Sequence, residues 1–90
     1  MERGRMGPGM ERVIERFPEH AASIQARFQG DESFREMCSD YVETLEALQR
    51  WQASHHAHRA ARIEEYRELA EGLETEIVTA LRLPTPRHED

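Results

Sequence analysis

The chain has 90 residues, of which 38% are hydrophobic and 33% are charged, and it carries a formal net charge of −6 at pH 7. A chain of this size forms one small domain at most, and so high a charged fraction is typical of exposed amphipathic helices and not of a β-sandwich or a barrel. The acidic balance, together with the lack of a basic face or an aromatic stacking platform, argues against nucleic acid as a partner.

Residues 1–9 contain three glycines and one proline without periodicity, which predicts a disordered leader. One or two short amphipathic helices are expected over residues 10–29, and Pro18 suits the first turn of the second because its missing N–H is not needed there. Gly30 is expected to end this segment as a left-handed cap. The apolar face of the segment consists of Met10, Val13, Ile14, Phe17, Ala21, Ile24 and Phe28.

A long helix is predicted over residues 32–53, with Asp31 as its N-cap and with Ser33 and Glu36 as an alternative capping box. Its apolar residues step alternately by four and by three along a narrow stripe. Such a stripe is the seam of a helix that packs on another helix. Trp51 extends the same side. This first stripe consists of Phe34, Cys38, Tyr41, Leu45 and Leu48.

The periodicity of the first stripe fails at its C-terminal end. A helix continued in phase would place Gln52, His55, Arg59 and Arg62 on the seam, and four polar residues cannot line a dry interface. We therefore predict that the chain turns between about residues 53 and 61. No Gly or Pro marks this turn and the alanines there favour helix, so the alternative is one continuous helix.

A second long helix is predicted over residues 61–82, and prolines stop it before a flexible tail at residues 83–90. Gly72 lies inside this helix at a cost of ~1 kcal/mol relative to Ala. It either permits a close approach between helices or has no packing role. The second stripe consists of Ile63, Tyr66, Leu69 or Ala70, Leu73 and Ile77.

Together these elements predict an all-α fold with a single helical domain at residues 10–82. Its main part is an antiparallel helical hairpin, preceded by the short helices. A lone hairpin buries too little apolar surface to offset the conformational entropy of its ordered residues. We therefore expect self-association into a homodimer or a larger assembly, such as a four-helix bundle. The expected interaction residues are Phe34, Tyr41, Leu45, Leu48, Trp51, Tyr66, Leu73 and Ile77.

Several short motifs span residues 17–82: Phe17-Pro18-Glu19 near the start, Asp31 with Phe34, Tyr41 with Leu45, and the segment from Leu69 to Ile77. On these motifs the chain resembles the YdcH-like family of small bacterial proteins. The resemblance implies a helical hairpin of unknown function. It implies no activity, catalytic residue or cofactor.

Cysteine usage and hydropathy bear on the cellular location. The chain has one cysteine, Cys38, which cannot form an internal disulfide and at a seam position behaves as a small hydrophobic residue. A reducing compartment fits this best. No apolar run follows the arginines of the first ten residues, and no segment approaches the ~20 apolar residues of a transmembrane helix. We expect a cytoplasmic protein with no membrane partner.

Three histidines at the predicted turn have metal-ligand chemistry. His55 and His58 can share a helix face at i, i+3 and bind a transition metal through neutral imidazoles. Zinc sites use three or four protein ligands, however, and Cys38 lies about five helical turns away. A solvated turn is the favoured interpretation of the cluster, which also includes His56, and a weak surface metal site is the alternative.

The acidic residues do not predict catalysis. Paired catalytic carboxylates converge in a pocket, whereas the glutamates between Glu64 and Glu71 fall along one exposed helix face. A small all-α chorismate mutase has a similar length, but that family relies on a lysine and this chain has none. We expect no enzyme activity and no cofactor.

Our leading hypothesis is a non-enzymatic interaction or adaptor module that associates with itself and presents an acidic surface to an unknown protein partner. Trp51 is a candidate anchor for that partner, or else it closes the end of the hairpin seam. The alternatives are a metal-binding protein that uses the turn histidines and a small all-α enzyme.

Overall fold

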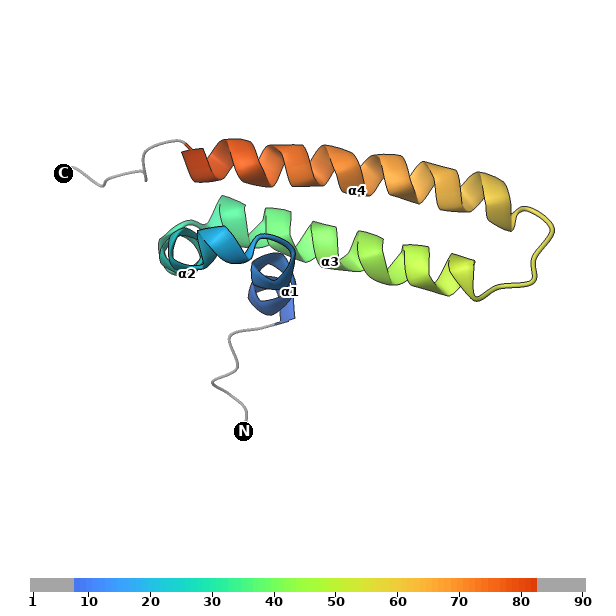
Figure 1. Cartoon of the computed structure of the whole chain (residues 1–90), viewed down its shortest axis with the longest axis horizontal. Helices are drawn as coiled ribbons and strands as arrows, with labels where there is room; N and C mark the ends of the chain where they lie inside the picture. Colours follow the sequence, from blue (N-terminus) through green and yellow to red (C-terminus); the bar gives the residue numbers. More distant parts are fainter. Residues whose placement is uncertain (1–7, 83–90) are drawn as a thin grey trace.

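The computed structural model describes residues 8–82, and within this range the chain consists of helices and turns and contains no strand. The prediction of an all-α fold is therefore confirmed. Two long helices, α3 and α4, lie side by side along the longest axis, and the short helices pack against one end of this pair (Figure 1). The elements are α1 (Pro8–Arg16), the 3-10 helix η1 (Pro18–His20), α2 (Ala21–Gly30), α3 (Glu32–Gln52) and α4 (Arg59–Arg82).

Hydrogen bonds shape the connection between α3 and α4 without the help of Gly or Pro. The Ser54 hydroxyl oxygen accepts a bond from the His56 backbone N–H at 2.9 Å, and His56 Nδ1 accepts one from the His58 N–H at 3.0 Å. The Arg59 guanidinium donates to the Gln52 carbonyl at 3.2 Å, at the C-terminal end of α3. Side-chain capping of this kind ends one helix and starts the next, since it satisfies backbone groups that have no partner in the helix.

The N-terminal boundaries differ from the prediction in two places. Helix α1 begins at Pro8, inside the predicted leader, and residues 1–7 and 83–90 lie outside the described residues. Gly30 is the last residue of α2, and the one residue that separates α2 from α3 is Asp31, with extended dihedral angles (φ −137°, ψ 103°). The prediction of a left-handed cap at Gly30 was wrong, because a single extended residue makes the connection.

The other predicted signals in this region are confirmed. Pro18 opens the 3-10 helix η1. The Asp31 carboxylate accepts a hydrogen bond from the Phe34 backbone N–H at 3.2 Å and so caps α3.

The hydrophobic core lies at the end of the α3–α4 pair where α1 and α2 pack, which we call the core end (Figure 1). Helix α1 contributes Val13, which is fully buried, and α2 contributes Ile24, also fully buried. In the second stripe, Ala70 is buried and Leu69 is 54% exposed, so Ala70 occupies the seam. The buried cluster consists of Met10, Val13, Phe17, Ile24, Phe34, Cys38, Tyr41, Ala70 and Ile77.

Gly72 has no packing role in α4. A Cβ placed on it would meet no atom within 4 Å, so it does not serve a close approach between helices. We expect Gly72→Ala to raise the free energy of unfolding by about 0.5–1 kcal/mol, because alanine loses less backbone entropy in a helix interior. Urea denaturation at a fixed protein concentration measures this change. An unchanged or lower free energy of unfolding would contradict the conclusion that Gly72 has no packing role.

Candidate interaction surface

The half of the α3–α4 pair that lies away from the short helices keeps apolar residues at its surface. We call residues 44–69 the distal half. Figure 1 shows that α1 and α2 pack at the other end, so among residues 8–82 the distal half is a pair of helices without a third layer. Leu69 is 54% exposed there, and further stripe residues are only partly covered. These partly buried residues are Leu45, Leu48, Trp51, Ile63 and Tyr66.

The residues predicted for interaction separate into two groups. Phe34, Tyr41 and Ile77 are buried in the core, where they hold α3 against α4 and are not accessible to a partner. Sequence periodicity cannot distinguish the two groups, because both lie on the same seam and only the packing of α1 and α2 separates them. The accessible group consists of Leu45, Leu48, Trp51, Tyr66 and Leu73.

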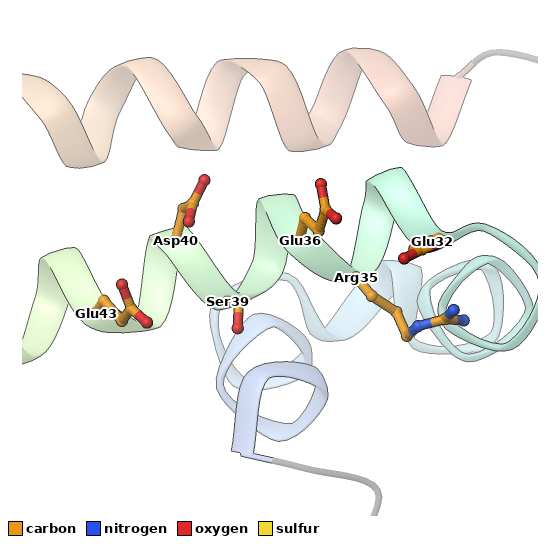
Figure 2. A pocket seen from close by; sticks show the side chains of 6 residues that line it. All are labelled: Glu32, Arg35, Glu36, Ser39, Asp40 and Glu43. Carbon is orange, nitrogen blue, oxygen red and sulfur yellow. The ribbon is translucent and has the colours of Figure 1, made fainter.

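Two shallow hollows follow the outer surface of α3. The first, of about 470 Å³, is shown in Figure 2 and is lined chiefly by acidic side chains. The second, of about 360 Å³, includes Ala47, Arg50 and Tyr66. Both hollows include Asp40 and Glu43, so they form one continuous surface that runs from an acidic end toward Arg50. The first hollow is lined by Glu32, Arg35, Glu36, Ser39, Asp40 and Glu43.

The turn histidines are exposed and do not share a helix face. His55 and His58 precede α4 and lie in the turn, as the favoured interpretation of the sequence has it, so the i, i+3 helix geometry of the alternative metal site is not formed. The structure instead brings together the rings of His56 and His58, whose centroids lie 5.4 Å apart. Within residues 8–82, no group of three or more His, Cys, Asp or Glu side chains is placed to hold a metal ion.

Trp51 lies at the end of the seam and is partly buried. Its ring meets the edge of the His56 ring, with centroids 5.7 Å apart and an interplanar angle of 88°. Edge-to-face contacts of this kind stabilise aromatic pairs. Trp51 therefore packs on the turn and leaves only part of its surface for a partner.

A polar cluster that the sequence did not predict joins α1 to the long helices. The Arg16 guanidinium forms two hydrogen bonds with the Glu74 carboxylate, at 3.0 and 3.1 Å. The Tyr41 hydroxyl donates to the same carboxylate at 2.6 Å. The three residues are far apart in sequence, and no local pattern indicates their meeting. The cluster holds α1 on the seam between α3 and α4.

The environment of this cluster sets the charge of its members. Burial alone raises the pKa of the Glu74 carboxyl, but hydrogen bonds from Arg16 and Tyr41 outweigh it and hold the pKa below its ordinary value of 4.5. Burial, reinforced by the hydrogen bond to Glu74, raises the pKa of the Tyr41 hydroxyl to about 12. At neutral pH the cluster therefore holds an ionised carboxylate between a guanidinium and a neutral phenol.

The cysteine and the glutamates of α4 have contrasting environments. Cys38 is a free, buried thiol, and burial raises its pKa to about 12, so it stays protonated at neutral pH. The glutamates of α4 between Glu64 and Glu71 are exposed, as the sequence predicted. Within residues 8–82, no helix is both long enough and apolar enough to cross a membrane.

Comparison with protein-family models, with curated proteins and with solved structures gives no match. The resemblance to YdcH-like proteins therefore stays a prediction.

Proposed function

We propose that the chain is a non-enzymatic interaction module, an antiparallel helical hairpin that associates with itself through its distal half. The observation that carries this proposal is the exposure of Leu69, at 54%, beside partly covered stripe residues in a region that no other described helix covers as a third layer. Burial of apolar area drives helix association in water. A second copy supplies the missing layer and completes a four-helix bundle.

The charge of the distal half supports pairing with a like molecule. The whole chain carries a net charge of −6, which opposes association between copies. Residues 44–69, by contrast, contain four arginines and four glutamates, so their formal net charge is zero with neutral histidines. The distal half of one copy therefore meets no net repulsion from a second copy.

The proposal includes a second surface. The outer face of α3 at the core end carries exposed carboxylates, which fit a basic region on a protein partner (Figure 2). Such a module acts in the cytoplasm as an adaptor. The resemblance to the small bacterial hairpin proteins supports the hairpin and leaves the partner open.

Replacement of Leu69 tests the self-association. We expect Leu69→Glu to weaken the dimer at least about tenfold, because it places a charge in the apolar contact without touching the core. Multi-angle light scattering over a range of protein concentrations measures the effect, and circular dichroism monitors the helix content. The matched control is Thr79→Glu, which adds the same charge at an exposed position of α4 near the core end. Equal effects of the two variants would contradict the proposed surface.

Metal binding at the turn is the second candidate function. The observation in its favour is the 5.4 Å separation of the His56 and His58 rings, next to the exposed His55. Neutral imidazoles at the surface bind transition metals, although two or three of them alone give a weak site. Calorimetric titration with zinc at neutral pH tests it. Saturation tighter than about micromolar, lost on His56→Ala with His58→Ala, would favour this function; weaker binding excludes it.

A further inference from the structure

Charge is distributed unevenly along the pair of long helices, and the acidic region lies at the core end. We call Glu32, Glu36, Asp40 and Glu43 the acidic face. All four side chains are exposed on α3 (Figure 2). Arg35 is the basic residue among them, but its guanidinium donates to backbone carbonyls at the end of α2, with the shorter bond at 2.7 Å. With Arg35 included, this region still has a formal charge of −3.

The opposite end of the molecule is basic. Residues 47–63, which we call the basic tip, contain three arginines and neither Asp nor Glu, so their formal charge is +3 with neutral histidines. All three arginines are exposed. Arg59 is bonded to a backbone carbonyl, Arg62 pairs with Glu65 at 2.8 Å just outside the tip, and Arg50 lines the hollow that also includes Asp40 and Glu43.

The acidic face and the basic tip are separated along α3. Glu36 and Arg50 are 14 positions apart, about 21 Å at the rise of an α-helix, and the nearest pair, Glu43 and Arg50, are seven positions apart, about 10 Å. Both separations exceed the Debye length of about 8 Å at physiological ionic strength, so the attraction within one molecule is largely screened. The two regions nevertheless lie along one continuous surface of α3, because the two hollows have residues in common.

We propose that two copies of the chain pair head to tail, so that the basic tip of each lies on the acidic face of the other. The pairing rests on the proposed self-association and adds to it the orientation of the copies and its electrostatic control. It identifies the second copy as the basic partner of the acidic face. A two-fold axis satisfies both contacts at once, since in such an interface each contact occurs twice. The formal charges of +3 and −3 on one chain are equal in size and opposite in sign.

The reverse orientation is disfavoured by the same charges. Copies that lie side by side in the same direction place the acidic face on the acidic face and the tip on the tip, and like charges in contact oppose association. In the head-to-tail dimer, the partly buried Tyr66 lies outside both charged regions, in the hollow that includes Asp40 and Glu43. This arrangement puts apolar contacts at the centre and charge pairs toward the rim, which is the usual anatomy of a protein interface.

A charge-exchange experiment tests the orientation. One variant carries Arg50→Glu with Arg62→Glu, which reverses the tip. The other carries Glu36→Arg with Asp40→Arg, which reverses the acidic face. Each variant alone opposes like charges, so we expect its dimer dissociation constant to rise at least tenfold. In an equimolar mixture, a dimer of one copy of each variant pairs the reversed tip with the reversed face and the native tip with the native face. We expect the dissociation constant of this mixed dimer to lie within about threefold of the wild-type value.

Sedimentation equilibrium measures these constants, and circular dichroism verifies that each variant keeps its helix content. The matched control is Glu71→Arg with Glu76→Arg, which changes two exposed glutamates of α4 outside both the acidic face and the distal half and leaves the dimer dissociation constant within about threefold of wild type. If the charge-reversed variants bind like wild type, or if their mixture does not recover, the head-to-tail pairing is wrong while self-association through Leu69 stands. If the wild-type chain is a monomer in sedimentation equilibrium, both the self-association and the head-to-tail pairing are wrong, and the acidic face is left to a different, basic partner.

Discussion

Replacing Ile77 with alanine is expected to lower the free energy of unfolding by about 2–5 kcal/mol. Ile77 is fully buried in α4 and belongs to the core cluster that holds α4 against the rest of the molecule. The substitution removes apolar contacts and leaves a cavity that the surrounding side chains fill only in part. Because small domains are stable by only about 5–15 kcal/mol, the loss is a large part of the total.

The control for this substitution is Ile63→Ala, which makes the same change at a partly buried position near the other end of α4. We expect it to lower the stability by about 1 kcal/mol, since less apolar area is removed from the packing. Urea denaturation of both variants at one protein concentration makes the comparison, because dimerisation couples stability to concentration. A smaller loss for Ile77→Ala than for Ile63→Ala would contradict the position of the core.

Replacing Glu74 with glutamine is expected to lower the stability by about 1–2 kcal/mol at neutral pH. The amide keeps an oxygen for the Tyr41 hydroxyl but cannot form two charge-assisted hydrogen bonds with Arg16. The Arg16 side chain is 52% exposed and the Glu74 side chain 23% exposed, so solvent screening keeps the effect below that of a buried ion pair.

The effect of Glu74→Gln depends on pH in a definite direction. The pKa of Glu74 in the folded chain is lowered from its ordinary value of 4.5, so its stabilising contribution is complete above that value and is lost as pH falls through the folded pKa. The difference in unfolding free energy between wild type and variant should therefore be largest at neutral pH and shrink toward about pH 3. Denaturant titrations at both pH values measure it. Glu76→Gln, at an exposed position of α4, is the control and should change little.

A gap between wild type and Glu74→Gln that stayed constant with pH would show that Glu74 acts through its shape and not through its charge. A gap that grew toward low pH would contradict the direction of the pKa shift. Either result would show that the ion pair between Arg16 and Glu74 does not hold α1 against the long helices.

The helices themselves could be predicted because their signals are local. Stripe spacing indicated both long helices, and the Asp31 cap and Pro18 set two boundaries that the structure confirms. The position of the break between α3 and α4 follows from polar residues where a seam would require apolar ones. Gly30 misled the prediction, because a glycine near a helix end has a left-handed conformation only if the following chain requires one.

Tertiary contacts could not be predicted from the sequence. The Arg16–Glu74–Tyr41 cluster joins residues from α1, α3 and α4, and only the packed fold brings them together. Nor could the sequence show which stripe residues are buried, since the packing of α1 and α2 decides this. Arg27 is buried as well, with its guanidinium 3.4 Å from Asp31, although an arginine at that position had no apolar signal.

The charge distribution is different, because it could have been read from the sequence. The lack of Asp and Glu between residues 47 and 63 is visible in the printed chain, next to an acidic first half of the helix that precedes it. A search for apolar periodicity does not detect it, and the net charge of −6 hides it. The structure adds the shared surface on α3 that gives the two charged regions a common orientation.

The molecular mass of the wild-type chain in solution tests the central claim most directly. Sedimentation equilibrium or light scattering at micromolar concentration should give twice the chain mass of 10.5 kDa, with a dissociation constant that rises when salt is increased. A mass of 10.5 kDa for a fully helical, cooperatively folded chain would contradict the account, because the distal half would then be stable without a partner.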